Sequence, residues 1–263
     1  LHAPRAVLNP PGRIPNRNHP TTLHLVPIFP VPGPYVPMPL FVPSTLSSVD
    51  VRRAILVALL LVLLPLPLAR AAQPAKATQP LLVCYGDSIT AGNGLPYGQS
   101  YPDDLQKMLN AQGYRYTVRN LGSSGATTTD ALANLPSVLR LHPAIVIIEF
   151  GGNDGLRGLP LSSSSRNLDQ IISALQKARI RVLLAGITLP ANYGQDYIRA
   201  FDRIFRTLAA KHHVPLVPMI YKNFIHVPGT IQSDGIHPTA KGSKIIAETI
   251  WPVLKPLLTK RRS

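Results

Sequence analysis

Short apolar runs alternate with longer amphipathic segments along residues 81–257. The short runs are rich in β-branched residues, which is typical of buried strands, and the longer ones carry apolar residues three or four positions apart, as one face of a helix requires. The predicted strands are residues 81–85, 114–120, 144–150, 181–187 and 214–217. The predicted helices are residues 100–112, 128–139, 165–178, 197–211 and 239–257.

This alternation predicts an α/β fold. Continuous apolar strands separated by helices are typical of a parallel sheet that is covered on both faces. Right-handed crossovers then wind the five predicted strands into a three-layer α/β/α sandwich. In such sheets ligands bind beyond the carboxyl ends of the strands, so functional residues are expected directly after strands.

The N-terminal part of the chain has a different composition. Residues 1–48 contain twelve prolines. Proline lacks an N–H donor and fixes its own φ angle, so this segment cannot build regular helix or sheet. We predict that it is disordered or forms loose polyproline II, or that it is not part of the native product.

A signal-like segment follows at residues 49–72. Arg52 and Arg53 precede an apolar run, and the small-x-small sequence Ala-Arg-Ala ends at Ala71. This pattern predicts a secretory signal peptide cleaved near Ala71, and therefore a periplasmic or secreted protein. The run is shorter than the roughly 20 residues that span a bilayer, and an uncleaved anchor is the alternative.

Residues 73–80 are then a linker, and residues 81–263 are the folded domain. The whole chain has a formal net charge of +15 at pH 7, and residues 73–263 contain 21 Lys and Arg against 11 Asp and Glu. The basic residues are dispersed, so no nucleic-acid partner is expected. We expect only a weak attraction of the protein to anionic membrane surfaces. The single cysteine, Cys84, lies in a predicted strand and is expected to be buried in the core. We also expect the protein to be a monomer.

The sequence Gly86-Asp87-Ser88 directly follows the first predicted strand. A serine between a strand and a helix presents its hydroxyl at the edge of the sheet, where N–H groups of the helix start can stabilise an anion. The hydroxyl becomes an effective nucleophile only when a base takes its proton. By itself, Gly-Asp-Ser is equally consistent with a turn that caps a helix.

A matching base occurs near the C-terminus, where Asp234 lies three residues before His237. This spacing lets the carboxylate bind Nδ1 of the imidazole and leaves Nε2 for a serine. Gly235 eases the turn between them, and Pro238 suits the first turn of the next helix. A lone Asp-x-x-His is often a surface pair, but here it supplies the groups that Ser88 lacks.

Two glycine-containing loops follow the second and third predicted strands. Residues 151–154 are Gly-Gly-Asn-Asp, and the Asn153 amide can donate a hydrogen bond to an oxyanion. In the loop 120–127, Gly125 or Gly122 can bring a backbone N–H close to a substrate oxygen. Each loop alone is also ordinary turn chemistry.

Taken in order, Gly-Asp-Ser, Gly, Gly-x-Asn-Asp and Asp-x-x-His resemble the SGNH (GDSL) hydrolase family over about residues 80–257. The chain looks most similar to the secreted bacterial branch of thioesterases, arylesterases and lysophospholipases. The resemblance implies a flavodoxin-like sandwich and a catalytic triad of Ser88, His237 and Asp234. It also implies an oxyanion hole formed by the N–H groups of Ser88 and Gly125 and by the Asn153 side chain.

The resemblance further implies the substrate class, which is an aryl ester, an acyl thioester or a lysophospholipid. Residues 155–160 correspond to the mobile substrate loop of that branch. The implied substrate-binding residues are Gly155, Leu156, Arg157, Leu159 and Pro160. Ala126 stands where relatives carry an acidic residue, which bears on fine specificity and leaves the triad intact.

Neither a metal nor another cofactor is expected. His212 and His213 are adjacent on a predicted helix and therefore face different directions, so we expect them to be exposed and not to form a ligand pair. Two other functions stay open: carbohydrate O-deacetylation on the same fold, and a catalytically silent, envelope-anchored binding protein. The single tryptophan, Trp251, offers little aromatic surface for a sugar.

Overall fold

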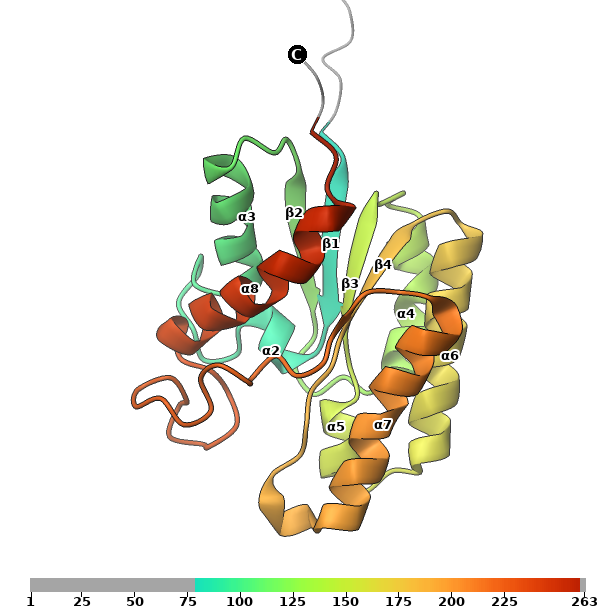
Figure 1. The fold of residues 1–263 in the computed structure, drawn as a ribbon, viewed down its shortest axis with the longest axis vertical. Coiled ribbons are helices and arrows are strands. Elements are labelled where there is room, and N and C mark those ends of the chain that lie inside the picture. Colours follow the sequence, from blue (N-terminus) through green and yellow to red (C-terminus); the bar gives the residue numbers. More distant parts are fainter. Residues whose placement is uncertain (1–78, 261–263) are drawn as a thin grey trace, which may run out of the picture. The chain divides into compact units, whose positions relative to one another are not determined.

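Five parallel strands form the central sheet of the computed structural model, which describes residues 79–260. The strands lie in the order β2-β1-β3-β4-β5 (Figure 1). Their bounds are β1 (Leu81–Gly86), β2 (Thr117–Gly122), β3 (Ile145–Glu149), β4 (Arg181–Ala185) and β5 (Leu216–Val217). β3 is buried along its whole length because helices cover both of its faces. The predicted three-layer α/β/α sandwich is confirmed.

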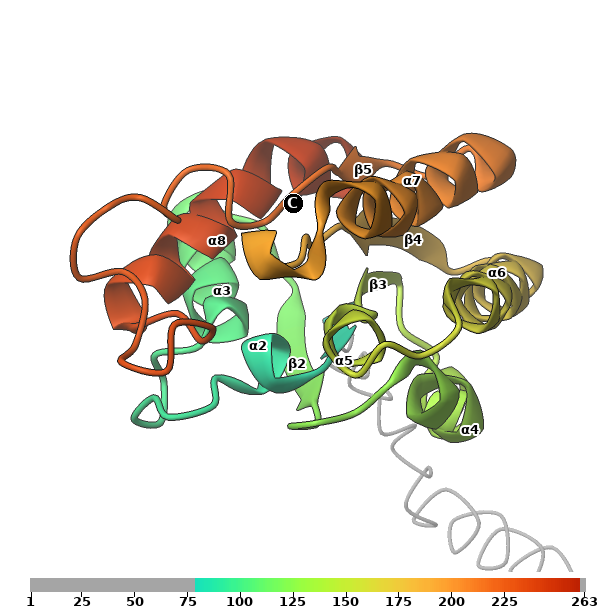
Figure 2. The same cartoon turned by 90° about the horizontal axis from the view of Figure 1, so that it is seen from below.

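Helices flank the sheet on both sides (Figures 1 and 2). Helices α3 (Tyr101–Ala111) and α8 (Ala240–Leu254) pack against each other on one face. The other face carries α4 (Thr128–Leu139), α6 (Leu161–Lys177) and α7 (Gln195–His212), which pack in a row. Each helix buries an apolar stripe, as the spacing of its hydrophobic residues predicts.

The bounds of two elements differ most from the sequence prediction. β2 begins at Thr117 rather than at residue 114, and it is an edge strand with several exposed side chains, so it is not one of the continuous apolar strands we expected. α6 begins at Leu161, four residues before the predicted start at residue 165. The added turn is stabilised by a tertiary contact, since the buried Ser164 hydroxyl donates to Asp154 at 3.0 Å.

The topological switch point lies between β1 and β3, because the chain continues from β1 to β2 in one direction and from β3 to β4 in the other. One-turn helices begin just beyond both strands: α2 (Ser88–Ala91) and α5 (Gly152–Leu156). A helix start at Ser88 was expected from the Gly-Asp-Ser motif, but neither helix is among the predicted periodic segments, since one turn leaves no periodic signal. Figure 2 shows both helices at this end of the sheet, which is where a parallel sheet of this kind binds ligands.

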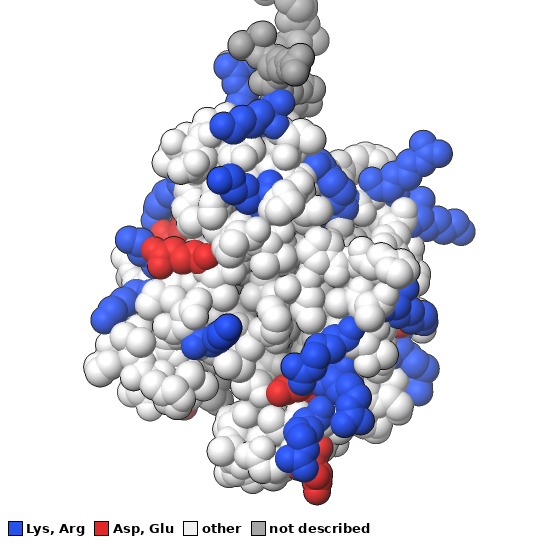
Figure 3. Space-filling view, viewed as in Figure 1, with Lys and Arg blue, Asp and Glu red and all other residues white. Residues whose placement is uncertain are grey.

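The predictions for residues 1–48 and 49–72, and for most of the linker at 73–80, lie outside the described residues. Between residues 79 and 260, no helix has the length and apolarity that a bilayer span requires. Cys84 is fully buried in β1, as predicted. Basic side chains are spread over the whole face shown in Figure 3, where acidic side chains are few.

Candidate active site

Ser88 is the first residue of α2, two positions beyond the end of β1. The preceding residue, Asp87, caps this helix, and its Oδ1 accepts a hydrogen bond from the Ile89 N–H at 3.0 Å. The helix ends after one turn at Gly92, whose φ of 78° places it in the left-handed region that favours glycine. This short capped turn fixes the Ser88 hydroxyl at the edge of the sheet.

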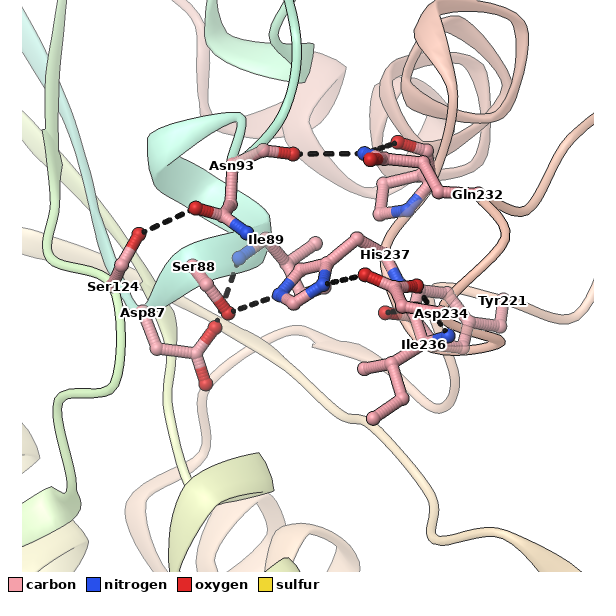
Figure 4. A network of polar contacts seen from close by, with 11 residues as sticks. Asp87, Ser88, Ile89, Asn93, Ser124, Tyr221, Gln232, Asp234, Ile236 and His237 are labelled. Atoms are coloured by element: carbon pink, nitrogen blue, oxygen red, sulfur yellow. Dashed lines mark hydrogen bonds and ion pairs between the residues drawn. The ribbon is translucent and has the colours of Figure 1, made fainter.

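His237 lies within hydrogen-bonding distance of Ser88 (Figure 4). Its Nε2 is 2.9 Å from Ser88 Oγ, and its Nδ1 is 2.6 Å from Asp234 Oδ2. The other carboxylate oxygen of Asp234 accepts from the backbone N–H groups of Ile236 and His237, both at 2.9 Å. The three predicted residues therefore form one continuous chain of hydrogen bonds.

The segment that carries Asp234 and His237 is folded back on itself. Ile231 and Pro238 form an antiparallel bridge, and Gly235 adopts a φ of 74° in the turn between them. Gln232 anchors this segment to the loop after α2, because its Nε2 donates to Asn93 O at 2.8 Å. Contacts inside the segment and across to the α2 loop thus hold the imidazole over Ser88 (Figure 4).

Three residues that line a cavity beside the Ser88 hydroxyl, namely Ser88, Gly125 and Asn153, carry potential donors to an oxyanion. The N–H groups of Ser88 and Gly125 donate no hydrogen bond within residues 79–260, and both residues line the cavity. Gly125 has a φ of 79°, which orients the peptide in the turn that precedes α4. Unpaired backbone N–H groups in a cavity wall are able to bind an oxyanion.

The third potential donor is the Asn153 amide, on α5. Its Nδ2 donates to Ala126 O at 3.0 Å and approaches Asp87 Oδ2 at 3.3 Å. Both amide protons therefore have acceptors here, so binding of an oxyanion requires Asn153 to exchange or share one of these contacts. The neighbouring Asp154 is buried and fixes α5, since it accepts hydrogen bonds from the Thr128 N–H and from the Ser164 hydroxyl.

A cavity of about 510 Å³ opens beside these groups. One wall comes from the loop after β4, at residues 187–190, and the other from residues 221–236. Most of the wall side chains are apolar: Leu156, Ile187, Leu189, Tyr221, Ile225, Ile231 and Ile236. This volume is in the range that accommodates a small organic ligand.

The predicted substrate-binding residues occupy different places. Leu156 lines the cavity. Gly155 is buried, and a Cβ there would lie 2.6 Å from a Leu189 methyl carbon. Arg157, Leu159 and Pro160 are exposed and lie outside the cavity wall, although the Arg157 guanidinium donates to Gly125 O at 2.9 Å.

Two carboxyl groups of the site are shifted in opposite directions. Burial opposes ionisation of Asp234, but hydrogen bonds from the His237 and Ile236 N–H groups and from the imidazole outweigh it and lower its pKa to about 2. Burial raises the pKa of Asp87 to about 6, against the hydrogen bond from the Ile89 N–H. At neutral pH both groups are ionised, and the lowered pKa keeps Asp234 charged in mildly acidic solution as well.

The two adjacent histidines are not equivalent, which corrects part of the prediction. His213 ends α7 and is exposed, as expected. The His212 side chain is only 9% exposed, because its Nε2 lies 2.5 Å from Asp169 Oδ1, on α6. Among residues 79–260, no group of three or more His, Cys, Asp or Glu side chains is arranged to bind a metal ion.

Several residues of the site carried no clear motif. The wall residues 187–190 follow β4, where the rule for parallel sheets places ligand contacts, but Thr188 is their one polar side chain and it belongs to none of the four motifs. Residues 221–231 lie in none of the helices or strands, so their contribution to the wall was not visible, whereas Asp234 and Gly235 were part of a predicted motif. Glu149 could have been noticed in the sequence, because it is a charged residue in an otherwise apolar predicted strand.

Residues 84–245 match the sequence model of the GDSL-like lipase/acylhydrolase family. The chain is 44% identical over 183 residues to the protein named "Esterase TesA" of Pseudomonas aeruginosa, covering 69% of this chain and 90% of that protein. It is 37% identical over 185 residues to "Thioesterase 1/protease 1/lysophospholipase L1" of Escherichia coli K12, covering 70% of this chain and 87% of that protein. A crystal structure of TesA superposes with a TM-score of 0.66 at 43% identity, over 68% of this chain and 99% of that one.

Proposed function

This chain belongs to the GDSL-like lipase/acylhydrolase family, and from that membership we propose that it is a serine ester hydrolase whose acyl-enzyme forms on Ser88. The observation that carries this proposal is the hydrogen-bonded chain from Ser88 Oγ through the His237 imidazole to Asp234. The relatives named above are an esterase and a thioesterase/lysophospholipase, which fits the same chemistry.

In the first half of the reaction, Ser88 Oγ attacks the acyl carbon while His237 Nε2 takes the hydroxyl proton. Asp234 holds the imidazole in the tautomer that leaves Nε2 free, and it stabilises the imidazolium that forms. His237 then protonates the leaving oxygen or sulfur as its bond to the acyl carbon breaks. In the second half, water gives a proton to His237 and attacks the ester on Ser88. The bond from the acyl carbon to Ser88 Oγ then breaks, His237 returns the proton to Oγ, and the acid is released.

Negative charge develops on the acyl oxygen in both halves. We assign its stabilisation to the N–H groups of Ser88 and Gly125 and to the Asn153 amide. The two backbone N–H groups have no competing acceptor within residues 79–260, which favours them as donors. Removal of one such donor typically lowers kcat by about 10²–10³.

The proposed substrate is an aryl ester, an acyl thioester or a lysophospholipid. The apolar walls of the cavity support an acyl chain rather than a sugar, which disfavours the alternative of carbohydrate O-deacetylation. Ile225 and Ile236 line the cavity and stay 40% and 38% exposed, so apolar surface is available to a lipid-like ligand. Periplasmic or secreted localisation, a monomeric state and weak attraction to anionic membranes remain predictions from the sequence.

The test combines a covalent label with a substrate panel. A fluorophosphonate should label the wild-type protein and the exposed-serine control Ser162→Ala, and fail to label Ser88→Ala at an unchanged thermal midpoint. p-Nitrophenyl esters, acyl-CoA and lysophosphatidylcholine then separate the three substrate classes. If Ser88→Ala is labelled or turns over as fast as the wild type, Ser88 is not the nucleophile. A wild type without label or turnover supports the silent binding protein instead.

A further inference from the structure

A buried polar network lies behind Ser88, centred on Glu149. This residue ends β3 and is fully buried. In the register of β1 with β3, Gly86 lies directly opposite Glu149. A Cβ at position 86 would come within 2.7 Å of Glu149 Oε2 and 2.0 Å of Thr90 Oγ1, so glycine is needed for these groups to meet.

Hydrogen bonds run through this network in one direction. Thr90 Oγ1 donates to Glu149 Oε2 at 2.8 Å. The Tyr101 hydroxyl, 2.8 Å from Thr90 Oγ1, must therefore be the donor of that pair. The Asp87 N–H also approaches Glu149 Oε2, at 3.4 Å, whereas the buried Oε1 has no donor within residues 79–260. Donors thus reach one oxygen of Glu149 and leave the other without a partner.

Glu149 and the Asp87 carboxyl group belong to the same buried network, in which the Asp87 N–H lies 3.4 Å from Glu149 Oε2. Two carboxyl groups buried so close together disfavour a second negative charge. Burial, and then the charge of Asp87, raise the pKa of Glu149 well above its usual value. Burial likewise raises the pKa of Tyr101 and of Tyr221, so these neighbours are uncharged at neutral pH. The pair therefore holds one proton and one negative charge.

Asp87 connects this pair to the Asn153 amide. Its Oδ2 accepts from Asn153 Nδ2 at 3.3 Å while its Oδ1 accepts from the Ile89 N–H at 3.0 Å. Asp87 is nearly fully buried, and its own N–H lies 3.4 Å from Glu149 Oε2. A change in its orientation would therefore alter the hydrogen bond that fixes the plane of the Asn153 amide.

We propose that Glu149 is a positioning residue for the reaction: its Oε2, which accepts from Thr90, also accepts from the Asp87 N–H and fixes Asp87, and the Asp87 carboxylate in turn orients the Asn153 amide toward the acyl oxygen. This inference rests on the proposed function, because it assigns Asn153 to the oxyanion hole. The residues that contribute to the reaction would then include Glu149, the last residue of the core strand β3, in addition to those that line the cavity. Small displacements of a group that acts in the transition state lower kcat strongly and leave substrate binding nearly unchanged.

The test is a double-mutant cycle on the full chain with a p-nitrophenyl ester. Glu149→Met removes every hydrogen bond at similar volume, and Glu149→Gln is the matched control because its amide both donates and accepts. We expect Glu149→Met to lower kcat by roughly 10-fold or more with little change in KM, and Glu149→Gln to restore most of that loss. In an Asn153→Ala background, Glu149→Met should lower kcat by less than about twofold, because the group through which it acts is gone.

An equal loss of kcat in both backgrounds would overturn the proposal, and so would a Glu149→Gln variant as impaired as Glu149→Met. If Glu149→Met does not fold, Thr90→Val replaces it, since this variant removes the donor to Oε2 at nearly constant shape. We expect it to lower kcat roughly threefold or more in the wild-type background and not in Asn153→Ala. Failure of the proposed function can be told apart from failure of this inference. In that case Ser88→Ala would still react with the fluorophosphonate and turn over substrate, whatever the kcat of the Glu149 variants.

Discussion

Replacement of Glu149 by glutamine should stabilise the protein increasingly as the pH rises. Burial keeps the wild-type side chain protonated when folded, whereas the unfolded chain releases the proton above its ordinary pKa of 4.5. When folding raises the pKa of an acid, the acid's contribution to stability is complete below the pKa of the unfolded chain. That contribution is lost as the pH rises above this value. The loss amounts to at most about 1.4 kcal/mol per pH unit until the folded pKa is reached.

Glutamine does not titrate, so the difference in unfolding free energy between Glu149→Gln and wild type isolates this contribution. Between pH 5 and pH 7 it should change by up to about 2.7 kcal/mol in favour of the variant. Asp87, whose pKa is about 6 in the folded protein, also titrates in this range, but it does so in both proteins and largely cancels. Urea unfolding at pH 5, 6 and 7 measures the difference. A difference that does not vary with pH would show that Glu149 is ionised in the folded protein, and the reasoning would fail.

Three further predictions follow from the geometry. Asp234→Asn should lower kcat by roughly 10³ or more, because the His237 tautomer is no longer fixed, while the thermal midpoint changes little; a loss below tenfold would contradict the role of Asp234. Gly122→Ala should lower the free energy of unfolding in urea by roughly 2–3 kcal/mol, because the added Cβ lies 2.0 Å from the Ala91 nitrogen. Gly113→Ala, whose Cβ would have no neighbour within 4 Å, should lower it by only about 1 kcal/mol. Equal losses for the two variants would refute the clash at position 122. Cys84 should react with a thiol reagent only in urea, because burial strongly raises its pKa and hides its sulfur, and fast labelling of the native protein would contradict this.

The sequence predicted most of what positions the reacting groups. The apolar strand 144–150 and its neighbours predicted the parallel sheet, and Gly-Asp-Ser and Asp-x-x-His predicted two segments that the fold brings together across 149 positions of the chain. Local patterns sufficed because each motif follows a strand or precedes a helix, so the sheet itself determines where it lies.

The rest depends on tertiary contacts that leave no local signal. The cavity walls come from residues 187–190 and 221–236, which lack a hydrophobic period. The contact between Asp87 and Glu149 joins two residues that are 62 positions apart and become neighbours only through strand pairing. A charged residue in an apolar strand can be noticed in a sequence, but its partner and its protonation state cannot be derived from local pattern.

The histidine and aspartate of the site belong to one four-residue segment, and the aspartate is held by backbone amides of that same segment. The tautomer of the imidazole is therefore determined locally, and a single distance, from Nε2 to the serine hydroxyl, depends on the rest of the molecule. Loss of the contacts that dock this segment would remove the base and its carboxylate together, as one preassembled unit. Substitutions in residues 221–236 are thus able to abolish turnover while leaving the sheet, the nucleophile and the backbone donors of the oxyanion site in place.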